Sequence, residues 1–401
     1  MKRLHYATGS VLLVALIAAF FSFAKFQHCV NSGFISPDNY VHTCYTDVAA
    51  LYGARGLDQH QWPYSSASNS VEYPPVTGVV MWVTALMNPH RHSYVDYFYI
   101  NAFLLALLFI GSVYLLSRMK PQFWYLFPLS PVVVASLFIN WDLWAVLSAL
   151  GSILLFDKKR YEWSAILLGL SIATKFFPIV LLTPIALIFL KRKELRRLVR
   201  YVGVTTLSWF LINLPFALFT WDGWLRFFTL NKDRPADFGS FYYAVQLLFP
   251  NRSFTWTKSG SVVLFILLTA AAAIYFFYLA KPALLSTLAI PSFAFVAIFT
   301  VTSKVYSPQY ILWITPLAIL AMRSYKARAP FWIWQGCELI YHLAIWEYLA
   351  QYTGAKFGIT GFTYALATLL RIAATIYFGV RVYVGSPDLE PETIPALEVT
   401  V

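Results

Sequence analysis

The chain has 401 residues, of which 59% are apolar and only 12% are charged. A soluble domain carries about twice that charged fraction, so these charged residues are too few to cover a soluble globule. The mean hydropathy of +0.62 and the recurring apolar runs predict an all-α polytopic membrane protein with the bilayer as its main partner. The net charge of +12 fits that class, because excess Lys and Arg mark the cytoplasmic side. The basic residues lie in short loops between apolar runs, which argues against a nucleic-acid partner.

The N-terminal segment predicts the orientation. Lys2 and Arg3 precede an apolar run from about residue 8 to 24, and no small-residue cleavage motif follows it. We interpret this run as an uncleaved signal anchor with a cytoplasmic N-terminus. Cys29 and Cys44 then fall on the outer side, where they are candidates for a disulfide; the alternative is two inert thiols.

Clusters of basic residues divide the middle of the chain. We assign all of them to the cytoplasm: 118–120, 157–160, 191–200 and 323–328. The two apolar stretches between them, about 127–156 and 163–190, are each too long for a single crossing. Each is therefore predicted to run out and back as a pair of short helices. The midpoints are polar, Asn140-Trp141-Asp142 in the first and Thr174-Lys175 in the second, as outer turns should be.

The remaining apolar runs predict further crossings, which brings the total to about 12. They lie near 97–116, 201–219, 259–279, 284–302, 308–322, 330–349 and 361–381. Residues 75–87 are apolar but too few to cross, so a partial or surface-lying helix is expected there. We predict one transmembrane domain, residues 1–385, with two large outer loops at about 25–74 and 220–257. Residues 386–401 are expected to be a disordered cytoplasmic tail.

The first outer loop contains a carboxylate in an informative place. Asp47 heads the segment DVAALYGARGL, which can form an amphipathic helix lying on the membrane. A carboxylate at the boundary between water and lipid can act as general base on a sugar hydroxyl. The alternative is that Asp47 caps this helix at its N-terminus, which spacing alone favours.

Several segments occur together in one order between about residues 40 and 345. They are CYTDVAALYGARGL, EYPPVTG, NWD, ATKFFP, NKDRPADFGS and TSKVYSPQYILW. This arrangement resembles the GT-C membrane glycosyltransferases, and among them glycosyltransferase family 87, the polyprenol-phosphate-mannose-dependent mannosyltransferases. The resemblance implies a GT-C-like fold with short juxtamembrane helices on the outer face. It also implies inverting transfer of a sugar from a polyprenyl phosphate, with Asp47 as the base. The first loop lacks a paired acidic D-x-D, so no cofactor and no divalent metal are expected.

The resemblance also gives the outer cations a role. A polyprenyl-phosphate donor leaves as an anion, so its site needs positive charge rather than a general acid. Lys175, Arg234 and Lys304 all fall in outer turns of the predicted topology. The alternatives are a snorkelling lysine at a helix end and a solvated loop arginine.

Two late helices contain ionisable residues in mid-span. Gln335, Glu338 and His342 share one face of the segment 330–349, and Arg371 lies in the middle of the last run. Such groups must face a cavity or one another. A buried Glu338–Arg371 pair is one interpretation, and phosphate or acceptor binding by Arg371 is the other. His342 has no second ligand at metal spacing.

The remaining candidates are assigned to substrate binding. Asp142 is also the reserve candidate for the base, although turns favour Asn and Asp for local reasons. The substrate-binding set is Tyr45, Arg55, Glu72, Tyr73, Asn140, Asp142, Asp237, Ser307, Gln309, Tyr310 and Glu338.

The sequence therefore predicts a plasma-membrane enzyme with its site on the outer face. It would transfer a hexose, most simply mannose, from a polyprenyl-phosphate donor to a glycan or glycolipid of the cell envelope. Two alternatives stay open: transfer of arabinofuranose or another pentose, and a secondary transporter or lipid-carrier flippase. The absence of a half-to-half sequence repeat and the collection of polar residues at one face favour an enzyme.

Overall fold

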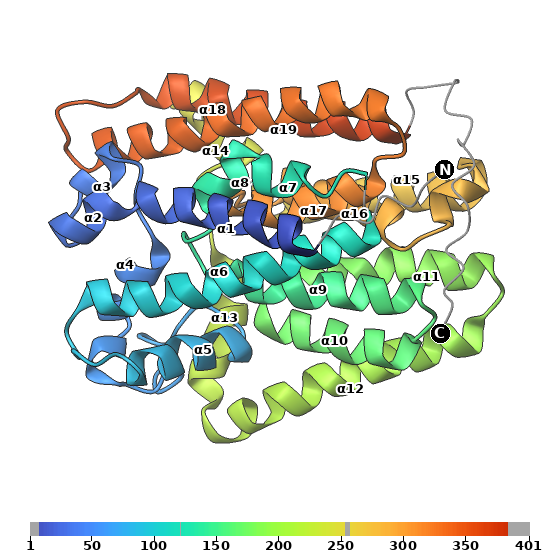
Figure 1. The fold of residues 1–401 in the computed structure, drawn as a ribbon, viewed down its shortest axis with the longest axis horizontal. Helices are drawn as coiled ribbons and strands as arrows, with labels where there is room; N and C mark the ends of the chain where they lie inside the picture. The colour runs from blue at the N-terminus through green and yellow to red at the C-terminus, as the bar shows by residue number, and fades with distance from the viewer. Residues whose placement is uncertain (1–7, 121, 253–256, 384–401) are drawn as a thin grey trace.

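The computed structural model describes residues 8–120, 122–252 and 257–383, and these residues form helices without a β-strand (Figure 1). The predicted tail, 386–401, lies outside the described residues. The predicted all-α class is confirmed, with five helices long and apolar enough to cross a membrane.

The first hundred residues build one end of the molecule, which we call the site end. Short helices gather there, on the left of Figure 1. Thr46 and Pro75 favour the starts of two of them, through a side-chain cap and a preset backbone angle. The elements are α1 (Thr8–Lys25), α2 (Gln27–Ser32), α3 (Asp38–Val41), α4 (Asp47–Ala54), η1 (Leu57–Gln59), α5 (Pro75–Leu86) and α6 (Tyr94–Met119).

The middle of the chain contains the two predicted helix pairs. Both turns form where expected: α9 begins at Asp142, and Lys175 is extended between α10 and the 3₁₀ turn that contains Pro178. The elements are α7 (Leu126–Leu129), α8 (Pro131–Ser136), α9 (Asp142–Asp157), α10 (Tyr161–Thr174), η2 (Phe177–Leu181), α11 (Leu182–Lys191) and α12 (Leu195–Phe219).

Helices α18 and α19 of the C-terminal part lie side by side above these helices in Figure 1. The predicted loop 220–257 contains two helices, and the later predicted apolar segments are helical close to their predicted bounds. Of these later helices, 259–279 and α19 are long and apolar enough to cross a membrane. The elements are α13 (Trp221–Asp233), α14 (Phe241–Leu248), α15 (Thr257–Ile274), the π-helical η3 (Tyr275–Leu279), η4 (Pro282–Leu285), α16 (Ala289–Thr302), η5 (Pro308–Tyr310), α17 (Ile311–Ala321), η6 (Tyr325–Ala327), α18 (Arg328–Tyr352) and α19 (Gly361–Tyr383).

The long apolar helices fit a lipid environment. The most apolar windows of α12 and of 259–279 are only 11% and 6% buried within the protein. Side chains such as Leu211 and Leu267 are therefore exposed on the surface of the chain. A large exposed apolar surface of this kind is stable where lipid covers it.

The predicted count of about 12 crossings is not confirmed. Helix α8 has six residues, about 9 Å of helix against a hydrocarbon core of about 30 Å. Pro128 and Pro131 interrupt the stretch before Asn140, so the outward arm of this pair is a broken helical segment. Helix α5, with 12 residues, is short, as the sequence predicted for this run.

The basic clusters lie toward the opposite end, which we call the basic end. Figure 1 places the α9–α10 turn, the α11–α12 turn and the start of α18 on its right-hand side. Specific contacts join these segments: Arg192 donates to the Tyr161 hydroxyl over 3.4 Å, and the rings of Phe123 and Tyr325 lie 5.1 Å apart. The clusters thus share one end, as a common assignment to one membrane side requires.

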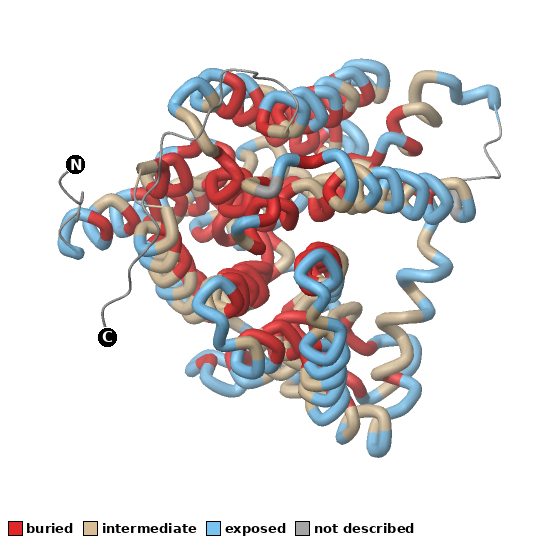
Figure 2. Tube along the Cα trace, turned by 90° about the vertical axis from the view of Figure 1, so that its right-hand side faces the viewer, coloured by how far each residue is buried: buried red, intermediate tan, exposed pale blue. Residues whose placement is uncertain are grey.

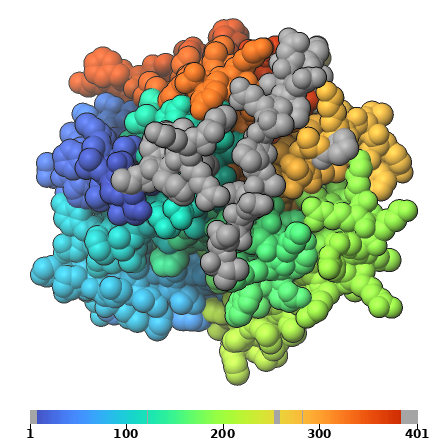
Figure 3. Space-filling view, turned by 45° about the vertical axis from the view of Figure 1, so that its right-hand side comes forward, coloured from blue at the N-terminus to red at the C-terminus, as the bar shows by residue number. Residues whose placement is uncertain are grey.

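Buried residues run through the middle of the molecule, and exposed ones surround them (Figure 2). Segments far apart in sequence contribute to one surface, with blue and cyan N-terminal residues next to orange C-terminal and green central ones (Figure 3). One apolar core joins the helices. The polar residues described next lie where α4 and α9 begin and where α10 ends, at the site end of the molecule.

Candidate functional site

Asp47 is the first residue of α4, but it does not cap the helix. The cap is Thr46, whose hydroxyl accepts from the Val48 amide over 3.1 Å. The Asp47 amide donates to the carbonyl of Ile139 over 2.8 Å, which fastens α4 to the turn before α9. The capping alternative is therefore wrong, and the Asp47 carboxylate is available for other contacts.

Two neutral groups hold that carboxylate. The Tyr45 hydroxyl donates to Oδ1 over 3.0 Å, and the Asn140 amide donates to Oδ2 over 2.6 Å. The same Asn140 nitrogen lies 2.8 Å from the hydroxyl of Tyr73. Asp47 itself is partly exposed. The carboxylate is thus oriented by hydrogen bonds from neutral groups.

Lys175 lies beside this group and joins it to Asp142. Its ammonium is 2.5 Å from Asp142 Oδ1 and 3.3 Å from Asn140 Oδ1, and it lies 4.5 Å from the centre of the Tyr73 ring. Asp142 is fully buried, whereas 14% of the Lys175 side chain is exposed. The two predicted turns therefore meet in one network with Asp47.

Aromatic rings support the buried carboxylate from behind. Trp313 donates from its indole nitrogen to Asp142 Oδ2 over 3.0 Å. This indole is stacked between Tyr310, at 3.6 Å, and Phe177, at 4.1 Å. Asp142 therefore has a cation on one oxygen and an indole on the other. This leaves it badly placed to accept a proton from a substrate.

Arg234 and Asp237 form a second charged pair near the same aromatic groups. The guanidinium donates to Asp237 Oδ2 over 2.9 and 2.5 Å. Arg234 also interacts electrostatically with Tyr73 and Tyr310, which places its charge toward the Lys175 network. Lys175 and Arg234 are thus two cations on the same side of the molecule as Asp47.

Lys304 points to the end of a helix. Its ammonium donates to the carbonyls of Asn231, Lys232 and Arg234 over 3.1, 3.3 and 2.8 Å, at the C-terminus of α13. A cation at this position is favourable because these carbonyls carry the negative end of the helix dipole. Lys304 therefore holds the backbone of Arg234.

The loops that carry Arg234 and Lys304 are paired. Asp237 donates its amide to the Lys304 carbonyl over 2.8 Å, and Tyr306 donates its amide to the Phe238 carbonyl over 3.2 Å. Gly239 has a φ of +76°, and a Cβ there would collide with the Tyr306 carbonyl. The glycine in ADFGS is therefore needed for the close approach of the two loops.

Glu338 and Arg371 form the buried pair that was one of the two interpretations. The Arg371 Nε donates to Glu338 over 2.8 Å, and its other nitrogens donate to the carbonyls of Tyr306 and Ser307 over 2.6 and 3.1 Å. Neither charged side chain is more than 1% exposed. The rings of Tyr306 and Tyr341 cover the guanidinium. Arg371 thus anchors the loop between α16 and α17.

The other predicted residues lie around this network. Arg55 and Glu72 form a two-point ion pair at 2.8 and 3.0 Å, directly before Tyr73. Gln309 is buried in η5, directly before α17, and Ser307 contributes its carbonyl to Arg371. Cys29 and Cys44 form a disulfide. The structure brings Asp47, Asn140, Tyr73, Lys175 and Asp142 into direct contact, and the remaining predicted residues frame them.

The environment of Asp47 changes its acidity. Burial raises the pKa of the Asp47 carboxyl above its ordinary value, although hydrogen bonds from Asn140 and Tyr45 and the charge of Lys175 act in the other direction. Burial and the neighbouring carboxylate also raise the pKa of Tyr45 well above its ordinary value, so this hydroxyl stays protonated and continues to donate. A carboxylate with a raised pKa is a stronger base than a solvated one.

An apolar hollow adjoins the charged residues. It is lined by Tyr73, Pro74, Pro75, Phe176, Trp209, Asn213, Trp224, Phe227 and Phe228. Two of these residues connect the hollow to the site. Tyr73 contacts Lys175, and Phe176 follows Lys175 in sequence. The sequence interpretation missed this hollow, because its rings come from loops and from α12 and α13, far apart in the chain.

Lys25 is a further feature that the sequence interpretation missed. Its ammonium donates to the Ala135 carbonyl over 2.7 Å and lies 3.4 Å from Nε2 of His342. His342 in turn contacts Ser136 and the ring of Trp346, which lies against Tyr45. A lysine at the end of an otherwise apolar helix was the available signal. Gln335, Glu338 and His342 are all buried, as their shared face predicted.

The model of glycosyltransferase family 87 matches residues 72–303, more than half of the chain. The chain belongs to glycosyltransferase family 87. The matched segment of this family 87 member includes Asn140, Asp142, Lys175 and Arg234, and it begins after Asp47. The predicted family is therefore confirmed. A comparison with curated proteins gave no match.

Proposed function

We propose that this family 87 member transfers a hexose, most simply mannose, from a polyprenyl-phosphate donor to a glycan or glycolipid acceptor. The observation that carries the proposal is the position of Asp47. Its carboxylate is oriented by two neutral donors on a residue that is partly exposed, whereas Asp142 and Asp237 each have a cation as partner. Asp47 is thus the site carboxylate best placed to accept a proton.

The reaction that fits these groups is a single displacement. Asp47 removes the proton of the acceptor hydroxyl as that oxygen attacks the anomeric carbon. The bond from this carbon to the phosphate oxygen breaks, and the polyprenyl phosphate leaves as an anion. Attack opposite to the leaving group inverts the anomeric configuration. The step needs no cofactor, and the acceptor proton ends on Asp47.

The donor phosphate is assigned to Lys175 and Arg234. In the free protein each cation is neutralised by one carboxylate, so a phosphate would share them with Asp142 and Asp237. Preorganised cations stabilise the charge that develops on the leaving group. Lys304 and Arg371 support this site by holding the loops of Arg234 and of Tyr306. We therefore assign them a positioning role in place of the direct phosphate contact that the sequence predicted.

The apolar hollow beside Tyr73 supports a lipid-linked donor. Its free space is too narrow for a water molecule, so its rings would have to move apart to contact the first isoprene units of the lipid. The contact of Tyr73 with Lys175 would then bring the phosphate next to a cation. Stacking of a sugar ring on Tyr73 or Tyr45 would then bring the anomeric carbon toward Asp47.

The outer membrane face is supported by two features. The site lies away from the basic clusters, which mark the cytoplasmic side in membrane proteins (Figure 1). The Cys29–Cys44 disulfide belongs to the loop that leads to Asp47, and such bonds persist in oxidising compartments. We therefore place the protein in the plasma membrane with its N-terminus in the cytoplasm.

The test uses the full-length protein in nanodiscs. It is incubated with polyprenyl-phosphate mannose and a cell-envelope lipid extract, and the products are analysed by mass spectrometry. We expect a new glycolipid or glycan heavier by one hexose, absent with Asp47→Asn. A parallel reaction with polyprenyl-phosphate arabinofuranose examines the pentose alternative. Product with the pentose donor alone would replace the hexose assignment. Movement of labelled donor between leaflets without any product would favour the flippase.

A further inference from the structure

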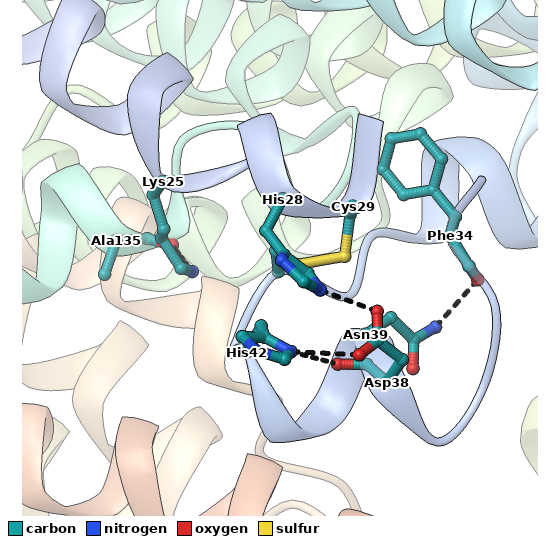
Figure 4. The surroundings of a disulfide bond; sticks show 9 residues. Lys25, His28, Cys29, Phe34, Asp38, Asn39, His42 and Ala135 are labelled. Atoms are coloured by element: carbon teal, nitrogen blue, oxygen red, sulfur yellow. Dashed lines mark hydrogen bonds and ion pairs between the residues drawn. A yellow bond between two sulfur atoms is a disulfide. The ribbon is translucent and has the colours of Figure 1, made fainter. Parts of the chain in front are cut away.

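A group of metal-ligating side chains lies outside the network described above. It comprises His28 in α2, Asp38 at the start of α3 and His42 directly after α3 (Figure 4). Each residue presents one nitrogen or oxygen atom, and these atoms all lie within 4.8 Å of one another. We propose that His28, Asp38 and His42 bind one divalent transition-metal ion of the zinc class.

The geometry is close to that of a three-ligand site. Nε2 of His28 lies 2.7 Å from Asp38 Oδ2, and Nδ1 of His42 lies 3.1 Å from Oδ1. Tetrahedral zinc sites place nitrogen and oxygen ligands about 2.0–2.2 Å from the ion, which separates the ligands by roughly 3.3 Å. Because the two imidazole rings are stacked, at least one of them must rotate before both nitrogens can point to a single ion. The fourth position would be taken by water, because the group is partly exposed.

Backbone restraints already arrange these ligands. The disulfide joins Cys29, next to His28, to Cys44, two residues after His42. Asp38 and His42 are one helical turn apart, a spacing that points both side chains to the same side. The two imidazole rings lie face to face, 3.5 Å between centres. His28 directs a nitrogen to the Asp38 carboxylate, and His42 directs one to this carboxylate and to the Asp38 backbone carbonyl. The cost of assembling the site is thus reduced before an ion binds.

The ligand set selects the kind of ion. Two imidazoles and one carboxylate suit Zn²⁺ and its neighbours, whereas Mg²⁺ and Ca²⁺ prefer oxygen ligands alone. The alternative is a pair of surface hydrogen bonds from histidine to aspartate. In that alternative each oxygen of the Asp38 carboxylate accepts from one histidine, and the His42 nitrogen also lies 3.1 Å from the Asp38 backbone carbonyl. The zinc titration described below distinguishes the two.

The site has a structural consequence for the loop that carries Asp47. Tyr40 lies between Asp38 and His42 in the chain, and its ring stacks on Tyr45 with 5.1 Å between ring centres. Tyr45 donates to Asp47. An ion that joins α2 to α3 would therefore restrain the position of Tyr45, and any effect on transfer rests on the proposed function. We assign the ion a structural role, because Thr43, Cys44, Tyr45 and Thr46 lie between His42 and Asp47 in the chain.

The experiment measures metal binding directly. Protein purified without a polyhistidine tag and treated with a chelator is titrated with Zn²⁺ in nanodiscs by calorimetry. We expect about one ion per chain, and an affinity at least about 100-fold weaker in His28→Asn/His42→Asn, because loss of ligands costs more than loss of their outer-shell partners. The matched control is His90→Asn/His92→Asn, which removes two exposed histidines that each face a single carboxylate.

Hydrogen exchange gives an independent readout. Zn²⁺ should slow exchange over residues 28–47 in the wild type and in the control, and should leave it unchanged in the ligand variant. Absence of Zn²⁺ binding by the wild type, or equal binding by the ligand variant, would overturn the proposal. If the double variant does not fold, Asp38→Asn takes its place. These measurements need no transferase activity, so failure of the mannose assay leaves the metal site standing.

Discussion

The Asn140 amide donates a 2.6 Å hydrogen bond to the Asp47 carboxylate across 93 residues of chain. This contact joins the first helix after the disulfide loop to the turn before α9. It also distinguishes the two candidates for the general base, because Asn140 lies between Asp47 and the Lys175–Asp142 ion pair. Asp47 is oriented but not neutralised, whereas Asp142 is neutralised and buried.

Asp47→Asn should abolish transfer without destabilising the protein. An amide cannot accept the acceptor proton, so the rate should fall by about 10²–10⁴-fold. Because the pKa of Asp47 is raised in the fold, its ionised form is less favourable there than in the unfolded chain. At neutral pH the asparagine variant should therefore unfold at an equal or higher temperature, and this difference should vanish at pH values below both pKa values.

Rate, donor binding and thermal unfolding are measured on the same preparations. Asp142→Asn serves as the comparison. If Asp47→Asn stays active and Asp142→Asn does not, the base belongs to the turn before α9.

The pH profile should report the same carboxyl. Transfer should fall as the pH drops through an apparent pKa above the ordinary value of about 3.9, because the base must be ionised. Tyr45→Phe removes a hydrogen bond that lowers the Asp47 pKa. The acidic limb of kcat/KM should consequently move to higher pH in this variant. A limb that stays in place would separate Tyr45 from the titrating group.

Lys175 and Asp142 should be coupled in stability. Lys175→Met leaves a buried carboxylate without its cation, which typically costs about 3–5 kcal/mol. Adding Asp142→Asn should restore most of that loss. The transfer rate from the donor should stay about 10²–10³-fold below that of the wild type in both variants, since the leaving phosphate lacks its cation. Recovery of donor kinetics together with stability in the double variant would make Lys175 purely structural.

Arg234→Ala should raise the KM for the donor more than Lys304→Ala does. Arg234 is proposed to contact the phosphate, whereas Lys304 contacts the carbonyls that hold the Arg234 backbone. Lys232→Ala is the matched control, because this lysine is exposed on the same helix. Initial rates at varied donor and fixed acceptor distinguish the variants. A larger effect of Lys304→Ala would return the direct phosphate contact to Lys304.

The sequence predicted the meeting of the two turns because topology alone carries that information. If both helix pairs leave the basic end and return to it, Asn140 and Lys175 must lie at the same opposite end. It did not predict that Thr46, rather than Asp47, caps α4. Thr and Asp both favour the N-cap position. Which of the two caps α4 depends on backbone angles that only the packed loop fixes.

Other features depended on contacts remote in sequence. The direction of Lys304 follows from the end of α13, which hydropathy placed inside an undivided loop. The apolar composition before α9 predicts a continuous helix, whereas two prolines divide it into α7 and α8. The group at His28 was missed because its ligands are separated by a loop that the disulfide closes.

The Glu338–Arg371 pair provides the last prediction. Arg371→Met should destabilise the protein by about 3–5 kcal/mol, because Glu338 remains buried without its cation. Arg371→Met/Glu338→Gln should regain stability, since an amide in place of the carboxylate carries no charge. The two roles of Arg371 then separate by kinetics on this folded double variant. A positioning role predicts a lower kcat with little change in the donor KM, because the loop at Tyr306 and Ser307 loses its anchor. Direct phosphate binding predicts a donor KM raised by at least about tenfold, the cost of one lost charge-assisted contact.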